Sequence, residues 1–136
     1  MIPALPALVL CLAIILFIAT AIKVGAARGK YGIHAPATSG HPEFERIFRV
    51  QQNTLEQLVA FIPSLVLFAQ YVSPNWAAGV GLVWIIGRIW FALSYYAAAE
   101  KRGPGFMLTF TALVVLLGGA MIGIAASLLR QALTAP

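Results

Sequence analysis

The chain has 136 residues, of which 61% are hydrophobic and only 10% are charged, and its formal net charge is +5. Soluble domains carry about 25% charged residues, so a soluble fold of this composition would lack the polar side chains needed to cover its surface. The composition therefore excludes an ordinary soluble domain and favours an integral membrane protein. The basic surplus falls between apolar runs, which indicates orientation in a bilayer rather than nucleic-acid binding.

The first apolar run predicts a transmembrane helix over residues 2–25. No Lys or Arg precedes it, so we interpret it as a retained helix and not as a cleaved signal peptide. Cys11, the single cysteine, lies in this run. It has no partner for an internal disulfide and no neighbours for a metal cluster, so we expect a small buried apolar residue and no metal.

The second helix is predicted over residues 43–72, after a polar loop that contains several Gly and Pro residues. Pro42 followed by Glu43 is typical of a helix start, where proline fits and an acidic side chain meets the positive end of the dipole. The first turns are polar, and the segment is continuously apolar only from Leu58. Pro63 lies within it and predicts a kink.

Two further helices are predicted over residues 76–99 and 106–129, separated by the linker 100–105 and preceded by a tight turn at Pro74-Asn75. The fold class is therefore an all-α integral membrane protein, a four-transmembrane-helix antiparallel bundle formed by residues 1–136 as one domain.

Basic residues concentrate in and beside the first and third loops: Lys23, Arg28, Lys30, Arg46, Arg49, Lys101 and Arg102. With four spans these two loops share one face, which the positive-inside rule predicts to be cytoplasmic, with both termini on the opposite side. Because no long eukaryotic retention tail is present, we expect a bacterial inner membrane.

Polar residues recur on one face of each of two predicted helices. Arg49, Asn53 and Glu56 follow each other at spacings of four and three. Arg88 and Tyr95, and then Arg102, follow each other at spacings of seven. Such stripes inside the membrane indicate a cleft for a polar ligand with carboxylates and amides, because lipid would not tolerate them. Interfacial tyrosines and a positive-inside arginine remain the alternatives for Tyr95 and Arg102.

Glu56 and Arg88 are each expected roughly 15 Å inside their helices. An isolated charge at that depth costs about 2.5 to 3.5 kcal/mol. We therefore hypothesise that the two side chains approach each other and offset that cost. A purely structural ion pair that fixes the helix register is the alternative.

Two stretches, FERIFRVQQNTLEQ and GLVWIIGRIWFALSYYAAAEKRGPGF, resemble the family of membrane-associated proteins in eicosanoid and glutathione metabolism (MAPEG). The chain is most similar to its type-2 and type-3 microsomal glutathione transferases, and the resemblance covers essentially the whole length. It implies a homotrimer that holds glutathione, the co-substrate, between subunits, and a lipophilic electrophile that arrives from the membrane lipids.

The resemblance also implies roles for individual residues. The implied glutathione-binding residues are Arg28, Arg49, Gln51, Asn53, Glu56, Arg88 and Tyr95, and Arg102 is implied to stabilise the thiolate as the catalytic residue. Phe91 stands where the leukotriene-forming members have a tyrosine, and Gly29 replaces a second basic residue. Both departures argue against leukotriene synthesis.

The resemblance thus implies a glutathione transferase that detoxifies lipophilic electrophiles, with glutathione-dependent reduction of lipid hydroperoxides as a further activity. Two alternatives stay open. The first is a non-catalytic lipid-binding scaffold of the same fold, which would form no thiolate. The second is a small proton-coupled exporter, because an intramembrane carboxylate such as Glu56 is also found in transporters.

Overall fold

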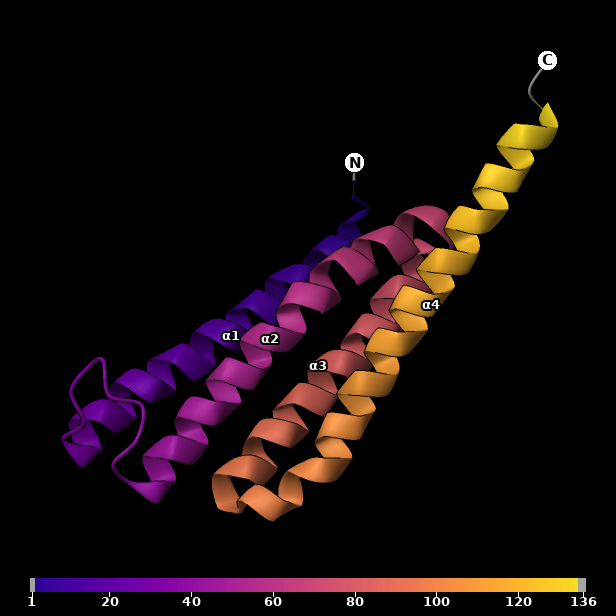
Figure 1. Cartoon of the computed structure of the whole chain (residues 1–136). Helices are drawn as coiled ribbons and strands as arrows, with labels where there is room; N and C mark the ends of the chain where they lie inside the picture. Colours follow the sequence, from indigo (N-terminus) through magenta and orange to yellow (C-terminus); the bar gives the residue numbers. More distant parts are fainter. Residues whose placement is uncertain (1, 135–136) are drawn as a thin grey trace.

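A computed structural model describes residues 2–134, and this range contains long α-helices joined at alternate ends and no strand (Figure 1). The helices are α1 (Ala4–Tyr31), α2 (Pro42–Tyr71), α3 (Pro74–Ala97) and α4 (Gly103–Thr134), and the short 3-10 helix η1 (Ala99–Arg102) precedes α4. Each of the 4 long helices is long and apolar enough to cross a bilayer. The expected all-α, four-helix integral membrane bundle is confirmed.

The first helix runs farther than predicted. α1 continues past Gly25 and ends at Tyr31, where Gly32 adopts a left-handed φ of 65° and its N–H donates to the carbonyl oxygen of Arg28. Glycine is the residue best suited to this C-terminal cap, because it has no side chain to clash. Arg28 consequently lies in the last turn of a helix and not in a loop.

The other helix boundaries follow their capping residues. His41 caps the start of α2, because its ring nitrogen accepts a hydrogen bond from the backbone N–H of Glu43 at 3.2 Å. The helix then continues through Pro63 to Tyr71. α3 begins at Pro74 and not at Trp76, because proline at the first helical position has no N–H to leave unbonded. The predicted 100–105 linker is instead η1 and the first turn of α4.

The bundle is built around α2 and α3, since α1 and α4 each pack against both of them. Phe61 of α2 stacks on Trp84 of α3, with ring centroids 4.0 Å apart, in the middle of the buried core. The outer surface is apolar as well, and Val59 and Ile122 are 71% and 74% exposed. The expectation that Cys11 is buried is wrong, because this residue is exposed on the same outer surface. Such a surface is stable when it faces lipid hydrocarbon and not water.

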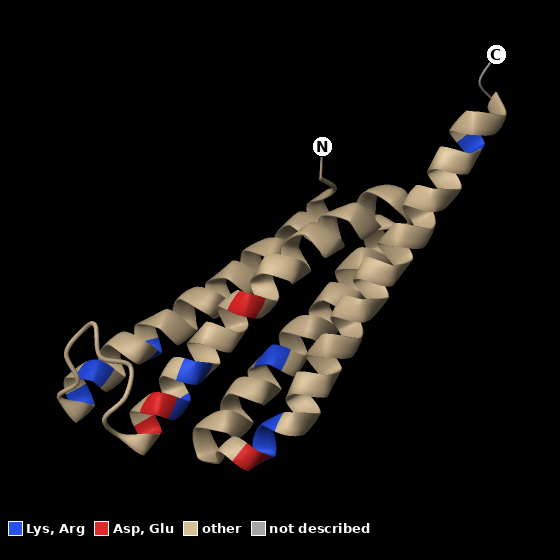
Figure 2. Cartoon of the chain, in the orientation of Figure 1, with Lys and Arg blue, Asp and Glu red and all other residues tan. Residues whose placement is uncertain are grey.

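Most charged residues gather at one end of the bundle, whereas Arg130 lies in the last turns of α4 at the other end (Figure 2). The charged end contains the α1–α2 loop and η1, so the first and third loops share one face, as topology requires. The first turn of α1 and the last turns of α4 lie at the other end, where α4 stands beyond the remaining helices (Figure 1). A polar site in this protein therefore belongs at the charged end.

Candidate functional site

A polar cleft of about 220 Å³ opens at the charged end, between α2, α3 and the start of α4. Its lining comes from four elements: Arg49, Asn53, Glu56, Phe91, Tyr95, Arg102 and Phe106. The helical spacing explains the α2 contribution, because residues four and three apart lie on one face. Five of the predicted site residues thus meet around one small hollow.

Arg88 supports this cleft from behind. The residue is only 1% exposed, and its two terminal nitrogens donate to Asn53 Oδ1 and Thr54 Oγ1, each at 3.0 Å. Its guanidinium carbon lies 4.1 Å from the centre of the Phe91 ring. The third nitrogen, Nε, is buried without a hydrogen-bond partner. Arg88 therefore fixes Asn53 and contributes positive charge without lining the cleft.

Glu56 and Arg88 approach each other as hypothesised, but they are linked through Asn53 and not paired within 4.0 Å. Asn53 stands between them, since its Oδ1 accepts from Arg88 and its Nδ2 donates to Glu56 Oε2 at 3.4 Å. In the described range the ion pair within 4.0 Å is instead Lys30 with Glu43, at 3.7 Å. Glu56 is exposed at the cleft, so its carboxylate remains accessible to a ligand.

Arg102 reaches the cleft from η1. Its guanidinium carbon lies 5.3 Å from the centre of the Tyr95 ring, and one terminal nitrogen donates to the carbonyl oxygen of Ala99 at 2.7 Å. A cation over an aromatic face is stabilised by about 0.5 to 1 kcal/mol at exposed sites. Tyr95 consequently orients a positive charge that is otherwise exposed to solvent.

Two of the predicted site residues lie elsewhere. Arg28 donates to the carbonyl oxygens of Ile33 and Ala37, at 3.4 and 2.8 Å, and lies over the ring of Phe44. Gln51 is two residues from both Arg49 and Asn53, and so points to the opposite side of α2 from the stripe. Neither lines the cleft of a single chain.

The model of the MAPEG family matches residues 5–122 of the chain. The chain belongs to this family. An uncharacterized protein from Synechocystis sp. is 51% identical over 88% of this chain and 87% of its own length. Human microsomal glutathione S-transferase 2 is 44% identical over 82% of this chain and 76% of its own. Leukotriene C4 synthase from Cavia porcellus is 33% identical over 95% and 86%, respectively.

In this MAPEG chain three residues of the site region escaped the sequence analysis. Thr54 holds Arg88, and buried Gln57 accepts from Trp84 Nε1 at 3.2 Å. Phe106 lines the cleft directly. Thr54 and Gln57 directly follow Asn53 and Glu56 of the polar stripe, so their own polarity within a predicted transmembrane helix was a signal for them. Phe106 follows two glycines and gave no polar signal.

Two hollows adjoin the cleft of this MAPEG protein and differ in character. One, of about 390 Å³, shares Arg49 and Tyr95 with it and includes Glu45 and Arg46, at the polar end. The other, of about 250 Å³, shares Asn53 and Glu56 with it and continues along the apolar residues Ala60, Phe110 and Leu113. The cleft therefore lies between these two hollows, which form a polar approach and an apolar approach to it. Within residues 2–134, no cluster of three metal-binding side chains occurs.

Proposed function

We propose that this protein is a membrane-bound glutathione transferase, which activates glutathione as a thiolate and joins it to a lipophilic electrophile. The observation that carries the proposal is the small cleft in which Arg49, Glu56 and Arg102 meet at the charged end of a transmembrane bundle. The relatives named microsomal glutathione S-transferase support the same chemistry.

The charges of the cleft complement those of glutathione, which has two carboxylates, one ammonium group and a thiol. Arginine binds carboxylates through paired hydrogen bonds, which suits Arg49 at the polar approach. Glu56 supplies a carboxylate for the ammonium group. Asn53 and Tyr95 supply polar groups for the peptide, and Arg88 holds Asn53 in place.

Arg102 is the proposed catalytic residue. The thiol of a free cysteine has a pKa of about 8.5, and only the thiolate is an effective nucleophile. A guanidinium beside the sulfur stabilises the thiolate and lowers that pKa. The thiolate then forms a bond to the electrophilic carbon, and the leaving group departs with the electron pair. The apolar hollow beside Glu56 supports entry of the electrophile from the bilayer.

The same thiolate can reduce a lipid hydroperoxide. Attack on the terminal oxygen breaks the O–O bond and releases the lipid alcohol once it takes up a proton. A second glutathione then displaces hydroxide from the oxidised sulfur and forms glutathione disulfide and water. This peroxidase activity is part of the proposal. It needs a second glutathione but no side chain beyond those that serve the conjugation.

We also propose that the working form is a homotrimer in which a neighbouring copy supplies Arg28 and Gln51. Two observations support it: both residues lie away from the cleft of their own chain, and that cleft of about 220 Å³ is smaller than ligand pockets of about 300 to 1,000 Å³. The charged end faces the cytoplasm of a bacterial inner membrane in this proposal, because basic loops are retained on that side.

Complementation between two defective copies tests the shared site. Arg28→Ala and Arg102→Ala should each be weakly active alone. Mixed in equal amounts, they should regain about one quarter of the wild-type sites, because only one in about four ring interfaces pairs an intact Arg102 with an intact Arg28. Mixtures as weak as the separate variants would place both residues in one chain or outside the site.

The ultraviolet difference spectrum on adding glutathione tests the central proposal. Thiolate absorbance near neutral pH that disappears in Arg102→Ala supports the transferase mechanism with Arg102 at the sulfur. Thiolate retained in that variant keeps the enzyme and removes Arg102 from this role. Absence of both thiolate and glutathione binding in the wild type would refute the transferase and favour the lipid-binding scaffold. Proton-dependent uptake into vesicles would favour the exporter.

A further inference from the structure

A second recess lies on the other side of α3 from the cleft, between the charged ends of α1, α2 and α3. Its volume is about 410 Å³, and its polar lining is Lys23, Lys30, Tyr31, Glu43 and Tyr96. Tyr96 and Tyr95 are consecutive residues of a helix and point about 100° apart. The recess is therefore separate from the cleft that contains Tyr95.

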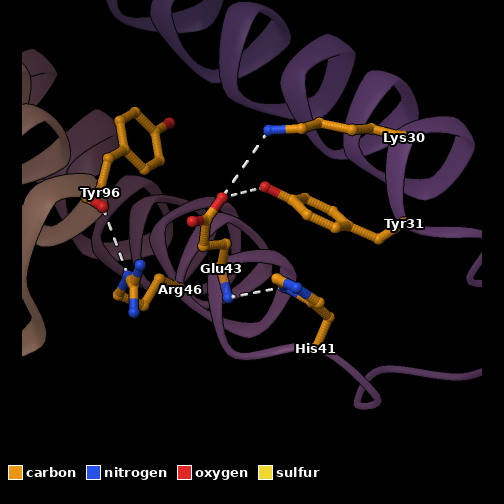
Figure 3. A network of polar contacts seen from close by, with 6 residues as sticks. All are labelled: Lys30, Tyr31, His41, Glu43, Arg46 and Tyr96. Carbon is orange, nitrogen blue, oxygen red and sulfur yellow. Dashed lines mark hydrogen bonds and ion pairs between the residues drawn. The ribbon is translucent and has the colours of Figure 1, made fainter.

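The recess carries positive charge in excess. Glu43 is already bonded, since it accepts from the Tyr31 hydroxyl and pairs with Lys30 at 3.7 Å (Figure 3). Lys23 has no carboxylate within 4.0 Å in residues 2–134, and its ammonium lies 4.2 Å from the centre of the Tyr96 ring. The Nε of Arg46 donates to the carbonyl oxygen of Tyr96 and adds a further cation nearby (Figure 3). The recess is thus lined by two cations, Lys23 and Lys30, and one carboxylate, and Arg46 lies beside it.

An apolar groove continues from this recess toward the middle of the bundle. It has a volume of about 190 Å³, shares Lys23 and Tyr96 with the recess, and runs between Leu16 of α1 and Ile89 and Leu93 of α3. Leu16 precedes Lys23 by seven residues, which is about 10 Å along a helix. Leu93 is 63% exposed, so the groove opens outward from the bundle. We name recess and groove together the α1–α3 groove.

The order of charge and apolar surface along the α1–α3 groove matches one class of molecule. The cations lie at the charged end of the bundle, where a membrane protein meets the headgroup layer, and the apolar part extends toward the hydrocarbon. A phospholipid has the same order, with its phosphate outside and its acyl chains inside. Anionic lipids are attracted to basic residues near the surface by about 1 kcal/mol per residue.

We propose that the α1–α3 groove binds one anionic phospholipid, with its phosphate at Lys23 and Lys30 and one acyl chain along Leu16, Ile89 and Leu93. Helix α3 separates this lipid from the glutathione cleft, and no step of the proposed transferase chemistry depends on the lipid. The site is therefore a lipid-binding site in its own right, and it can be tested in protein without added glutathione.

Native mass spectrometry of the protein, released from nanodiscs that hold equal parts of phosphatidylglycerol and phosphatidylcholine, tests this proposal. The wild type should retain one phosphatidylglycerol per chain in preference to phosphatidylcholine. Lys23→Gln should lower that preference about fivefold, as expected for the loss of one basic contact. Lys23→Arg should keep the preference, and Leu93→Trp should reduce the retention of both lipids by filling the groove.

Lys101→Gln is the matched control, because Lys101 is an exposed lysine at the same end that lines neither recess nor groove. It should leave the preference unchanged. Equal retention of the two lipids by the wild type would overturn the proposal, and so would an equal loss in Lys101→Gln, which would indicate diffuse charge. Displacement of the lipid by inorganic phosphate alone would overturn it in favour of a free-phosphate site. Should Lys23→Gln fail to fold, the wild-type comparison and Leu93→Trp still decide.

Discussion

The contact between α4 and α3 beside the cleft depends on Gly105, and replacing it is a direct test of how the site is built. A Cβ added to Gly105 would lie 2.4 Å from the backbone nitrogen of Phe91 and 2.7 Å from its Cα, whereas ordinary contacts begin at 3.4 Å. Both neighbours are backbone atoms and cannot rotate away. Gly105→Ala therefore requires α4 to move from α3 by about 1.0 Å at the point where Phe91 and Phe106 line the cleft.

Such overpacking costs about 1 to 3 kcal/mol of stability. A misplacement of about 1 Å can lower the rate of an enzyme by about 100-fold. Gly103→Ala is the matched control, because a Cβ there meets nothing within 4 Å. In a helix this substitution is neutral or stabilising by up to about 1 kcal/mol.

The measurements are the thermal unfolding midpoint in detergent and kcat/KM for glutathione conjugation of an aromatic halide. Gly105→Ala should lower both, and Gly103→Ala neither. Equal midpoints and equal rates for the two variants would refute the close approach of α4 to α3. A lowered midpoint with an unchanged rate would keep the packing but separate it from the chemistry.

Three further predictions concern the polar contacts of the bundle. Arg88→Met removes two hydrogen bonds to α2 and should lower the free energy of unfolding by about 1 to 3 kcal/mol, with partial recovery in Arg88→Lys; unfolding equal to wild type would contradict this. Trp84→Phe leaves the Gln57 oxygen unpaired and should cost about 1 kcal/mol, most of which a second change, Gln57→Met, should restore in a double-mutant cycle. Tyr95→Leu should weaken glutathione binding by titration calorimetry because Arg102 loses its aromatic partner, whereas Tyr95→Phe should lose less; equal losses would assign the effect to the hydroxyl.

Hydrophobic length predicted the helices well, because the need to span a bilayer leaves few alternatives. The residues at which the helices begin and end were harder to predict. The extension of α1 to Tyr31 depends on a left-handed cap at Gly32, and apolar run length carries no information about it. The assignment of Pro74 to a turn was wrong, because proline is compatible with both a turn and a first helical turn, and only the Ser73 cap decides between them.

The cleft was partly predictable, because helical spacing determines which residues share a face. Helical spacing placed Arg49, Asn53 and Glu56 on one face, and the structure brings Arg102 to them. Spacing says nothing about the distance between helices, so the bridging position of Asn53 between Arg88 and Glu56 was missed. That detail depends on how closely α2 and α3 pack, which small residues decide in ways a single sequence does not reveal.

The C-terminal part of α4 is packed against α2 over its first turns and exposed over its last turns. Helix α4 approaches the end of α2 closely at Gly123, where a Cβ would lie 2.7 Å from the carbonyl oxygen of Tyr71. Beyond it Leu128 and Leu133 are 60% and 76% exposed, and the family match has already ended at residue 122. A dye attached to this exposed segment would report the depth of α4 in the bilayer and would leave the chemistry at the opposite end of the bundle unchanged.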